Sequence, residues 1–546
     1  MRIQVLFAAV TFAAGVFSGS GCGGETAQSG PQRDAGAGSD SGLTPADGGA
    51  DGGTMDDGAQ DAGKDTGADA GTNKDGGPAD AGNVDAPRLD PAATIAEVAL
   101  YQGVKTSLGG SGGPVAQRNA SVVAGRESLV RVFVDPGGSA GRQVSCEVVV
   151  KSGASKSVFS GTASISGAST DGSLSSTCNV TVPGTSVSAD AAISARLVSA
   201  NAAVVPAGSA HPARFPADGS YLDLDAGPSG GPIRLVLVPM KYDTDGSGRL
   251  PDTGPQVLGM IERLFTTAYP ADRLEITVRD ALPWSEEPTW GGGVDFNKLN
   301  QLMADTKERD GAESGAYYFG MIRPAATFAE YCAWVCVAGQ GWVVDDPSDG
   351  AIRAASGVAF DADQAAWTCA HEVGHLHGRY HAPCSTMDSD GSYPYSGGKI
   401  GVWGWDRSSN VLYSPDQYTD FMGYCEDQWV SDYTWNGLFK RIQAVNALPP
   451  PPAGPGRAVR FLDVMPDGSH RWGMTVSLRT PPRGTPLAVD LLDDTGARAG
   501  TTIAALFRHA HGGGVTLLVD ARLPGTGHLV FGGAPGVPAV RIPVEH

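Results

Sequence analysis

A short run near the middle of the chain places three histidines and one glutamate at the spacing of a catalytic metal site. His371 and His375 are one helical turn apart, so both imidazoles can reach one ion while Glu372 projects beside them. Gly378 can adopt the positive φ that ends the helix and brings His381 round as a third ligand. Three neutral nitrogens leave one position of a zinc ion open for a water, which becomes acidic enough to lose its proton to Glu372. The run HExxHxxGxxH therefore predicts a hydrolytic zinc centre.

Three other histidines receive a different interpretation. His377 lies two residues after His375, on the other side of the helix, and we expect it to be packed or solvated and not to bind metal. His509 and His511 lie near a glycine-rich turn, and we expect them to be surface residues and not ligands.

The run resembles that of the metzincin clan of zinc endopeptidases, which also carry a methionine turn beneath the metal. Residues 420–425, with Met422, fit that turn. In some metzincin families, the astacins and serralysins among them, a tyrosine two positions after the methionine steadies the oxyanion, and Tyr424 stands there. The alternative is a core tyrosine in an ordinary turn. Residues 382–384 match none of the best-known subfamilies, so the subfamily stays open.

The resemblance covers residues 233–447 and implies a central α/β (α+β) domain with a mixed sheet backed by helices. Hydrophobic periodicity agrees with it. Strands are expected at 233–238, 274–278, 317–322, 339–344 (edging the substrate cleft) and 357–360. Helices are expected at 255–267 (capped by Asp252 or Thr253), 296–306, from Asp363 through the zinc ligands, and 435–446.

The start of the chain indicates export. Arg2 precedes an apolar stretch, residues 3–17, that is too short to span a membrane and suits a signal peptide over residues 1–21. Cys22 follows in a context that resembles a bacterial lipobox without the usual aliphatic residue. We therefore expect a lipid anchor at Cys22, with plain signal cleavage and secretion as the alternative.

Residues 22–92 predict a disordered tether, because almost no large apolar side chains are present to form a core. Its fourteen acidic residues, against four basic ones, supply about half of the net charge of −20. The acidity thus describes a self-repelling linker, not an acidic active site. With no basic cluster, nucleic-acid binding is not expected.

The remaining residues suit three domains that could each bury a core. Residues 93–226 have β-sandwich composition, and a propeptide or inhibitory role for them stays open. Residues 227–449 hold the metzincin-like domain. Residues 450–546 are again β-sandwich-like, with strands expected at 487–492 and 515–519. Neither flanking domain shows a catalytic constellation.

Eight cysteines in an exported chain favour disulfides. Cys146 and Cys178 share one β-domain and are natural partners. Cys384 follows the third histidine and Cys425 the methionine turn, so a bridge is expected where these segments converge. Cys332, Cys336 and Cys369 compete for a remaining bond.

Two further features have competing interpretations. Residues 243–248 resemble a calcium loop but lack the later acidic ligand of an EF-hand, so we favour a turn. Four aromatic residues between the third histidine and the methionine turn could line a specificity wall or pack in the core. They are Tyr393, Tyr395, Trp403 and Trp405.

The sequence therefore predicts a secreted or lipid-anchored zinc endopeptidase that acts on protein or glycoprotein substrates. One alternative is a surface adhesin that keeps zinc only for binding, although an intact Glu372 argues against it. The other is a glycoprotein- or mucin-specific metalloprotease.

Overall fold

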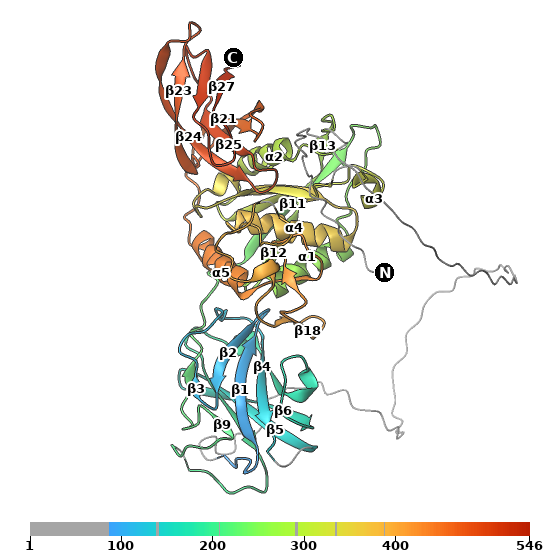
Figure 1. The fold of residues 1–546 in the computed structure, drawn as a ribbon, viewed down its shortest axis with the longest axis vertical. Helices are drawn as coiled ribbons and strands as arrows, with labels where there is room; N and C mark the ends of the chain where they lie inside the picture. The colour runs from blue at the N-terminus through green and yellow to red at the C-terminus, as the bar shows by residue number, and fades with distance from the viewer. Residues whose placement is uncertain are drawn as a thin grey trace, which may run out of the picture. The chain divides into compact units, whose positions relative to one another are not determined.

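The computed structural model describes residues 87–137, 141–206, 208–289, 293–333, 336–386 and 388–545 (Figure 1). The predicted signal peptide, Cys22 and most of the tether lie outside these residues. Among the described residues, no helix is both long and apolar enough to cross a membrane. The fold is mixed α/β, with several sheets and few helices.

The first part of the described chain forms two antiparallel sheets with a shared core. Their order is β3-β2-β1-β4-β7 and β10-β8-β5-β6, with β9 beside β8. Apolar side chains from both sheets, such as Val98 and Val148, are fully buried together. Arg88 and Leu89, at the end of the predicted tether, form bridges with Val204 and Val198 of this region. The strands are β1 Thr94–Tyr101, β2 Lys105–Gly110, β3 Gly113–Pro114, β4 Ser128–Asp135, β5 Arg142–Ser152, β6 Ser155–Ile165, β7 Cys178–Val182, β8 Ala192–Val198, β9 Arg214–Phe215 and β10 Leu222–Asp223.

The central part is a mixed sheet with helices on both faces. Strands β12, β11, β14 and β16 are parallel, and β15 runs antiparallel to β16. Helices α1 and α4 lie on one face and α2 on the other (Figure 1). The elements are β11 Ile233–Tyr242, α1 Pro255–Thr267, β12 Leu274–Val278, β13 Leu282–Trp284, α2 Phe296–Arg309, β14 Ala316–Ile322, α3 Phe328–Tyr331, β15 Gly339–Val343, β16 Ala354–Val358, α4 Ala362–Leu376, β17 Gly404–Asp406, β18 Val411–Tyr413, β19 Thr419–Asp420, β20 Gln428–Trp429 and α5 Asp432–Asn446.

Most predicted elements of this part are confirmed, although several bounds differ. Helix α5, for example, begins at Asp432, three residues before the predicted Trp435. Helix α1 and β12 have the predicted bounds, but β16 begins three residues before the predicted Gly357. The predicted caps of α1, Asp252 or Thr253, are wrong, because Gly254 is the N-cap residue and gives no side-chain cap. The Asp252 carboxylate instead accepts a hydrogen bond from the Gly254 N–H in the preceding turn, and Pro255 at the first helical position has no N–H that needs a partner.

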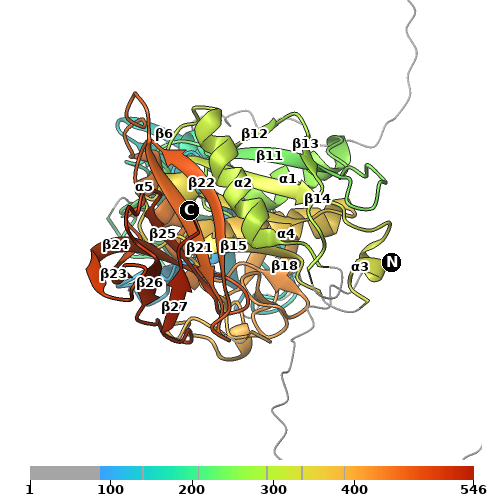
Figure 2. The same ribbon diagram turned by 90° about the horizontal axis from the view of Figure 1, so that it is seen from above.

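The C-terminal strands continue the central sheet. Val343 and Trp342 of β15 pair with Arg508 and His509 of β24, giving one sheet of 13 strands within the described residues. Residues 450–546 were expected to form a separate β-sandwich-like domain. Their strands share a sheet with the central part instead, because β24 pairs with the outer edge of β15. Figure 2 shows β22 beside α2. The strands are β21 Arg457–Val464, β22 His470–Leu478, β23 Thr485–Leu492, β24 Arg498–His509, β25 Val515–Asp520, β26 His528–Phe531 and β27 Val540–Pro543.

Candidate active site

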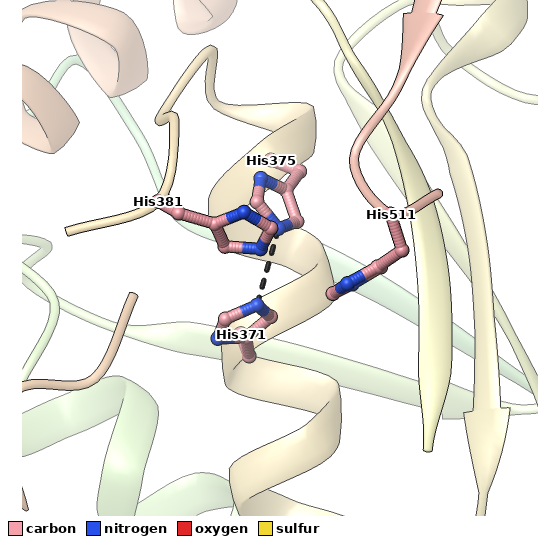
Figure 3. Close-up of side chains that lie close together, drawn as sticks. All are labelled: His371, His375, His381 and His511. Carbon is pink, nitrogen blue, oxygen red and sulfur yellow. Dashed lines mark hydrogen bonds between the residues drawn. The ribbon is translucent and has the colours of Figure 1, made fainter. Parts of the chain in front are cut away.

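Helix α4 carries the first two histidines and the glutamate of the HExxH run. Asp361 caps the helix by accepting a hydrogen bond from the Gln364 N–H at 3.0 Å. One turn separates His371 from His375, and their Nε2 atoms lie 3.1 Å apart (Figure 3). The helix therefore aims both rings at one point.

A sharp turn after α4 brings the third histidine to the same point. Gly378 has a φ of 72°, and a Cβ there would lie 2.9 Å from the Val344 carbonyl oxygen. Only glycine suits this position. The His381 ring then lies 5.3 Å from the His371 ring and 4.7 Å from the His375 ring, measured between centroids. The structure thus brings together all three predicted ligands.

Backbone carbonyls orient two of the rings. His371 Nδ1 donates to the Phe421 carbonyl at 2.8 Å, and His375 Nδ1 donates to the Arg379 carbonyl at 2.7 Å. Because a carbonyl can only accept, each Nδ1 carries the hydrogen and each Nε2 presents a lone pair. Burial lowers the pKa of His371, His375 and His381, which keeps the rings neutral.

This donor set fits a zinc ion. Tetrahedral zinc with bonds of about 2.0–2.1 Å to nitrogen needs its ligand atoms about 3.3 Å apart. The 3.1 Å between the Nε2 atoms of His371 and His375 is close to that separation. The cluster of His371, His375, His381 and His511, whose ligand atoms all lie within 4.8 Å of one another, could hold a metal ion.

Glu372 lies beside the histidines in a nearly solvent-free position. The residue is 2% exposed, and its Oε1 is 3.1 Å from Nε2 of His511. Its Oε2 is buried without a hydrogen-bond partner among the described residues. The close approach of β15 depends on Gly339, since a Cβ there would lie 2.7 Å from Glu372 Oε1. One carboxylate oxygen is held and the other remains available to accept a proton.

The predicted methionine turn lies against helix α4. A Cβ on Gly374 would overlap the sulfur of Met422, so the glycine allows the thioether to contact α4. Tyr424 has its hydroxyl 3.0 Å from His381 Nε2. Burial raises the pKa of Tyr424, so this hydroxyl stays protonated and can donate. The turn therefore places Tyr424 at the histidine cluster, as its position in the sequence predicts.

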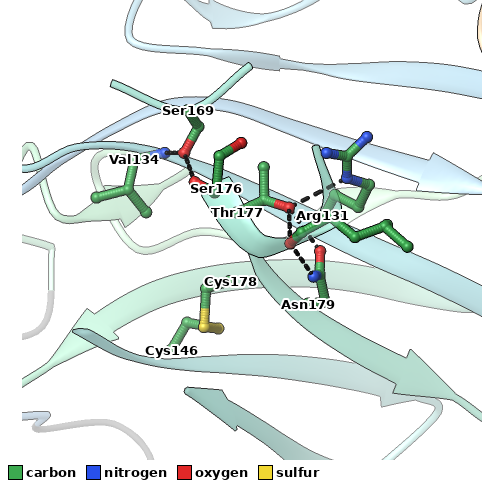
Figure 4. Close-up of a disulfide and its surroundings, with 9 residues drawn as sticks. Arg131, Val134, Cys146, Ser169, Ser176, Thr177, Cys178 and Asn179 are labelled. Atoms are coloured by element: carbon green, nitrogen blue, oxygen red, sulfur yellow. Dashed lines mark hydrogen bonds between the residues drawn. A yellow bond between two sulfur atoms is a disulfide. The ribbon is translucent and has the colours of Figure 1, made fainter. Parts of the chain in front are cut away.

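The disulfides agree with the predicted pairing. Cys384 is bonded to Cys425 and Cys146 to Cys178. The second bridge joins β5 of one N-terminal sheet to β7 of the other (Figure 4). The remaining bond is Cys332 to Cys336, which leaves Cys369 as a buried free thiol among the described residues.

The expectation that His509 and His511 are surface residues is wrong. His509 is 5% exposed and lies 2.8 Å from the Thr516 hydroxyl. His511 reaches the histidine cluster, with its ring 4.9 Å from that of His381. The sequence around His511 shows only a histidine after a strand and before a glycine-rich turn. That pattern does not indicate which other strand β24 pairs with, so it could not predict that His511 reaches the cluster.

The cleft-edge prediction for residues 339–344 needs a similar correction. Part of β15 already has a neighbour, because Trp342 and Val343 pair with β24 and the Ala510 N–H donates to the Gly341 carbonyl at 3.1 Å. An extended substrate cannot take the backbone groups that Ala510 and β24 occupy. The C-terminal strands thus limit how much of this edge can bind a peptide.

The other predicted features lie outside the histidine cluster. Trp405 is 4% exposed and packs with apolar residues of β1 and β4, and Trp403 lies against the same group. The Tyr393 hydroxyl donates to the Lys399 carbonyl at 2.9 Å, and the Tyr395 hydroxyl to Asp432 at 2.7 Å. These contacts favour the core-packing interpretation over a specificity wall.

The calcium-like segment is a turn held by its own contacts. Asp245 accepts from the backbone N–H of Ser247 at 3.0 Å and forms an ion pair with Arg249. The turn interpretation suits this hydrogen bonding.

Comparison with known proteins locates one match in the chain. Residues 344–428 match the family Peptidase M66. No curated protein matches the chain. The matched segment contains all three predicted ligands, Glu372 and Tyr424, so the site described above falls within it. The part of this chain that carries the histidine cluster is thus similar to a metallopeptidase family, Peptidase M66.

Proposed function

We propose that this chain is an exported zinc endopeptidase of the metzincin type that hydrolyses peptide bonds of extracellular proteins. One observation carries the proposal: three neutral imidazoles converge beside a glutamate whose Oε2 is buried without a partner among the described residues. A buried carboxylate oxygen without a hydrogen-bond partner lowers the stability of the fold, so its presence is typical of a group that takes part in a reaction. The match to Peptidase M66 supports the reaction class.

Each residue has a role that its position suits. His371, His375 and His381 would hold zinc, which when bound polarises the scissile carbonyl and makes water more acidic. Glu372 Oε2 accepts the proton of the attacking water and passes it to the leaving nitrogen. Tyr424 donates its hydroxyl to the oxygen that gains charge as the carbonyl is attacked.

The substitution Glu372→Gln tests this assignment. The amide keeps the shape of the side chain but cannot take a proton, so we expect about one zinc per chain and a loss of proteolysis of about a thousandfold or more. Glu308→Gln is the matched control, because Glu308 lies on α2 and pairs with Arg479 instead of the histidine cluster. Metal analysis combined with casein or gelatin cleavage measures both properties.

The adhesin alternative makes the opposite prediction. A wild-type protein that holds zinc yet cleaves nothing across broad peptide and glycoprotein libraries would refute the endopeptidase proposal. Cleavage confined to glycosylated substrates would instead favour the glycoprotein- or mucin-specific enzyme.

Export and a lipid anchor at Cys22 are part of the proposal, although these residues lie outside the described ones. A lipidated Cys22 should carry the protein into the detergent phase, and Cys22→Ser should release it or block its processing. Intact mass spectrometry that finds a mature N-terminus without acyl groups would leave a freely secreted enzyme.

A further inference from the structure

His511 comes to the active site from the C-terminal strands and not from the matched peptidase segment. It follows β24, more than a hundred residues after the zinc-site helix, and Figure 3 shows its ring facing the three predicted ligands. Its Nε2 is 3.1 Å from Glu372 Oε1, and its Nδ1 is within hydrogen-bond distance of the Tyr424 hydroxyl. The His511 side chain therefore contacts Glu372 and Tyr424, the two residues that act on the substrate in the proposed function.

The backbone next to His511 is firmly placed. The Ala510 N–H donates to the Gly341 carbonyl of β15 at 3.1 Å, and His509 pairs with Trp342. Trp342 is 1% exposed and stacks on Phe461 of the C-terminal strands at 5.7 Å. A residue that follows such a packed pairing has a defined position, as a supporting group in an active site requires.

Hydrogen-bond chemistry assigns a role to each nitrogen of His511. A carboxylate oxygen can only accept, so Nε2 carries a hydrogen and donates it to Glu372 Oε1. Nδ1 then has a lone pair that can accept the single Tyr424 hydroxyl hydrogen while no substrate is bound. In the proposed reaction that hydrogen turns to the substrate oxygen as it gains charge. Oε1 of Glu372 is thereby engaged, while Oε2 is left without a partner among the described residues.

We propose that His511 is a positioning residue of the active site that holds Glu372 so that Oε2, and not Oε1, meets the attacking water. The inference rests on the proposed function. Although the ligand atoms of His511 and the other three histidines lie within 4.8 Å of one another, a fourth nitrogen ligand would close the coordination position that hydrolysis needs. Both nitrogens of His511 also already face hydrogen-bond partners.

The test compares His511→Ala and His511→Gln in the full-length protein. For the alanine variant we expect kcat to fall about 10- to 100-fold with KM nearly unchanged, because the lost contact acts through the general base. Glutamine keeps an N–H donor and should recover part of the loss. Zinc content, and the visible spectrum of the cobalt(II)-substituted protein, should match the wild type in both variants.

The matched control is His509→Gln. This histidine lies two residues earlier and bonds to Thr516 instead of the cluster, so a defect caused by disturbing the C-terminal strands would appear here too. We expect nearly full activity. In the Tyr424→Phe background, His511→Ala should cost less than in the wild type, since the two residues share a contact.

Three results would overturn the inference while leaving the endopeptidase intact. Unchanged kcat in His511→Ala would make the contact incidental. Higher activity would show that His511 obstructs the site. Loss of zinc or an altered cobalt spectrum would make it a metal ligand. A wild-type protein that cleaves nothing would remove both this inference and the proposed function.

Discussion

The predicted role of Tyr424 depends on the resemblance to metzincins, and the structure places this residue at the histidine cluster. Its hydroxyl lies 3.0 Å from Nε2 of His381, and the ring is 4.8 Å from that of His381 between centroids. Burial raises the pKa of Tyr424, so the hydroxyl keeps its hydrogen near neutral pH. A donor held there can stabilise a developing oxyanion.

We predict that Tyr424→Phe lowers kcat by about ten- to a thousandfold with little change in zinc content or KM. The ring stays and only the donor is lost. Tyr380→Phe is the control, because the Tyr380 hydroxyl bonds to Asp345, 3.1 Å away, outside the cluster. Steady-state kinetics with one peptide substrate decides the point, and an unchanged kcat would return Tyr424 to a packing role.

His377 illustrates how two histidines two residues apart can differ completely. Its ring stacks on Tyr317 at 4.5 Å and meets the edge of Tyr269 at 5.5 Å. Burial lowers the pKa of His377 to about 3, so the ring is a neutral core group. The packed alternative for this residue is confirmed.

The segment after His381 and the methionine turn are held together by backbone hydrogen bonds and a disulfide. The Ala382 N–H donates to the Met422 carbonyl at 3.0 Å, and the Tyr424 N–H to the Cys384 carbonyl at 2.9 Å. The Cys384 to Cys425 bridge closes a loop with a sequence separation of 41. These contacts keep the segment after His381 next to the turn beneath α4.

We predict that replacing both Cys384 and Cys425 by serine makes the protein lose zinc on mild heating sooner than the wild type. In the chain-entropy model, opening a loop of this length stabilises the unfolded chain by about 3 to 4 kcal/mol. A zinc-sensitive dye followed during a temperature ramp measures the release.

The matched control is the double serine variant at Cys146 and Cys178. That bridge joins the two N-terminal sheets, so its loss should leave zinc retention almost untouched. Equal zinc loss in both variants would mean that the bridge between Cys384 and Cys425 does not retain zinc better than the distant bridge does.

The N-terminal sheets are fastened to the central domain by buried polar contacts, which bears on the propeptide alternative. The Arg126 guanidinium donates to the carbonyls of Thr267, Tyr269 and Ala271 at 2.8 to 2.9 Å, at and just after the end of α1. Trp435 of α5 donates its indole N–H to the Ser121 carbonyl at 3.0 Å. Such an interface favours a permanent accessory domain over a segment that is removed.

We predict that Arg126→Met lowers the free energy of unfolding by about 3 kcal/mol or more, because several buried carbonyls lose a charged donor. Burial lowers the pKa of Arg126 to about 9, which still leaves it charged near neutral pH. Urea unfolding measures the change. Arg498→Met is the control, since Arg498 forms an exposed pair with Asp490 that should contribute about 1 kcal/mol or less.

The same interface predicts that active protein retains residues 93–226. N-terminal sequencing of the active form checks this directly. An active form that begins after residue 226 would restore the propeptide alternative.

Local features of the chain sufficed for most of the central domain. The 3.6-residue period of α1 and α4, the apolar runs of β11 and β14, and the glycine at position 378 depend on near neighbours in sequence. The cluster of His371, His375 and His381 follows from the same short-range geometry, because one helical turn and one glycine turn fix all three.

Features that depend on distant pairing could not be predicted in this way. The Cys384 to Cys425 bridge was an exception, because both cysteines flank segments that a metzincin-like site must bring together. His511 had no such guide. Its place beside Glu372 arises only because β24 pairs with the outer edge of β15. Strand pairing is made by backbone N–H and C=O groups, which are the same in every residue type except proline, so the side-chain sequence does not specify this partner. Tertiary structure alone therefore decided that a histidine from the C-terminal strands completes the site.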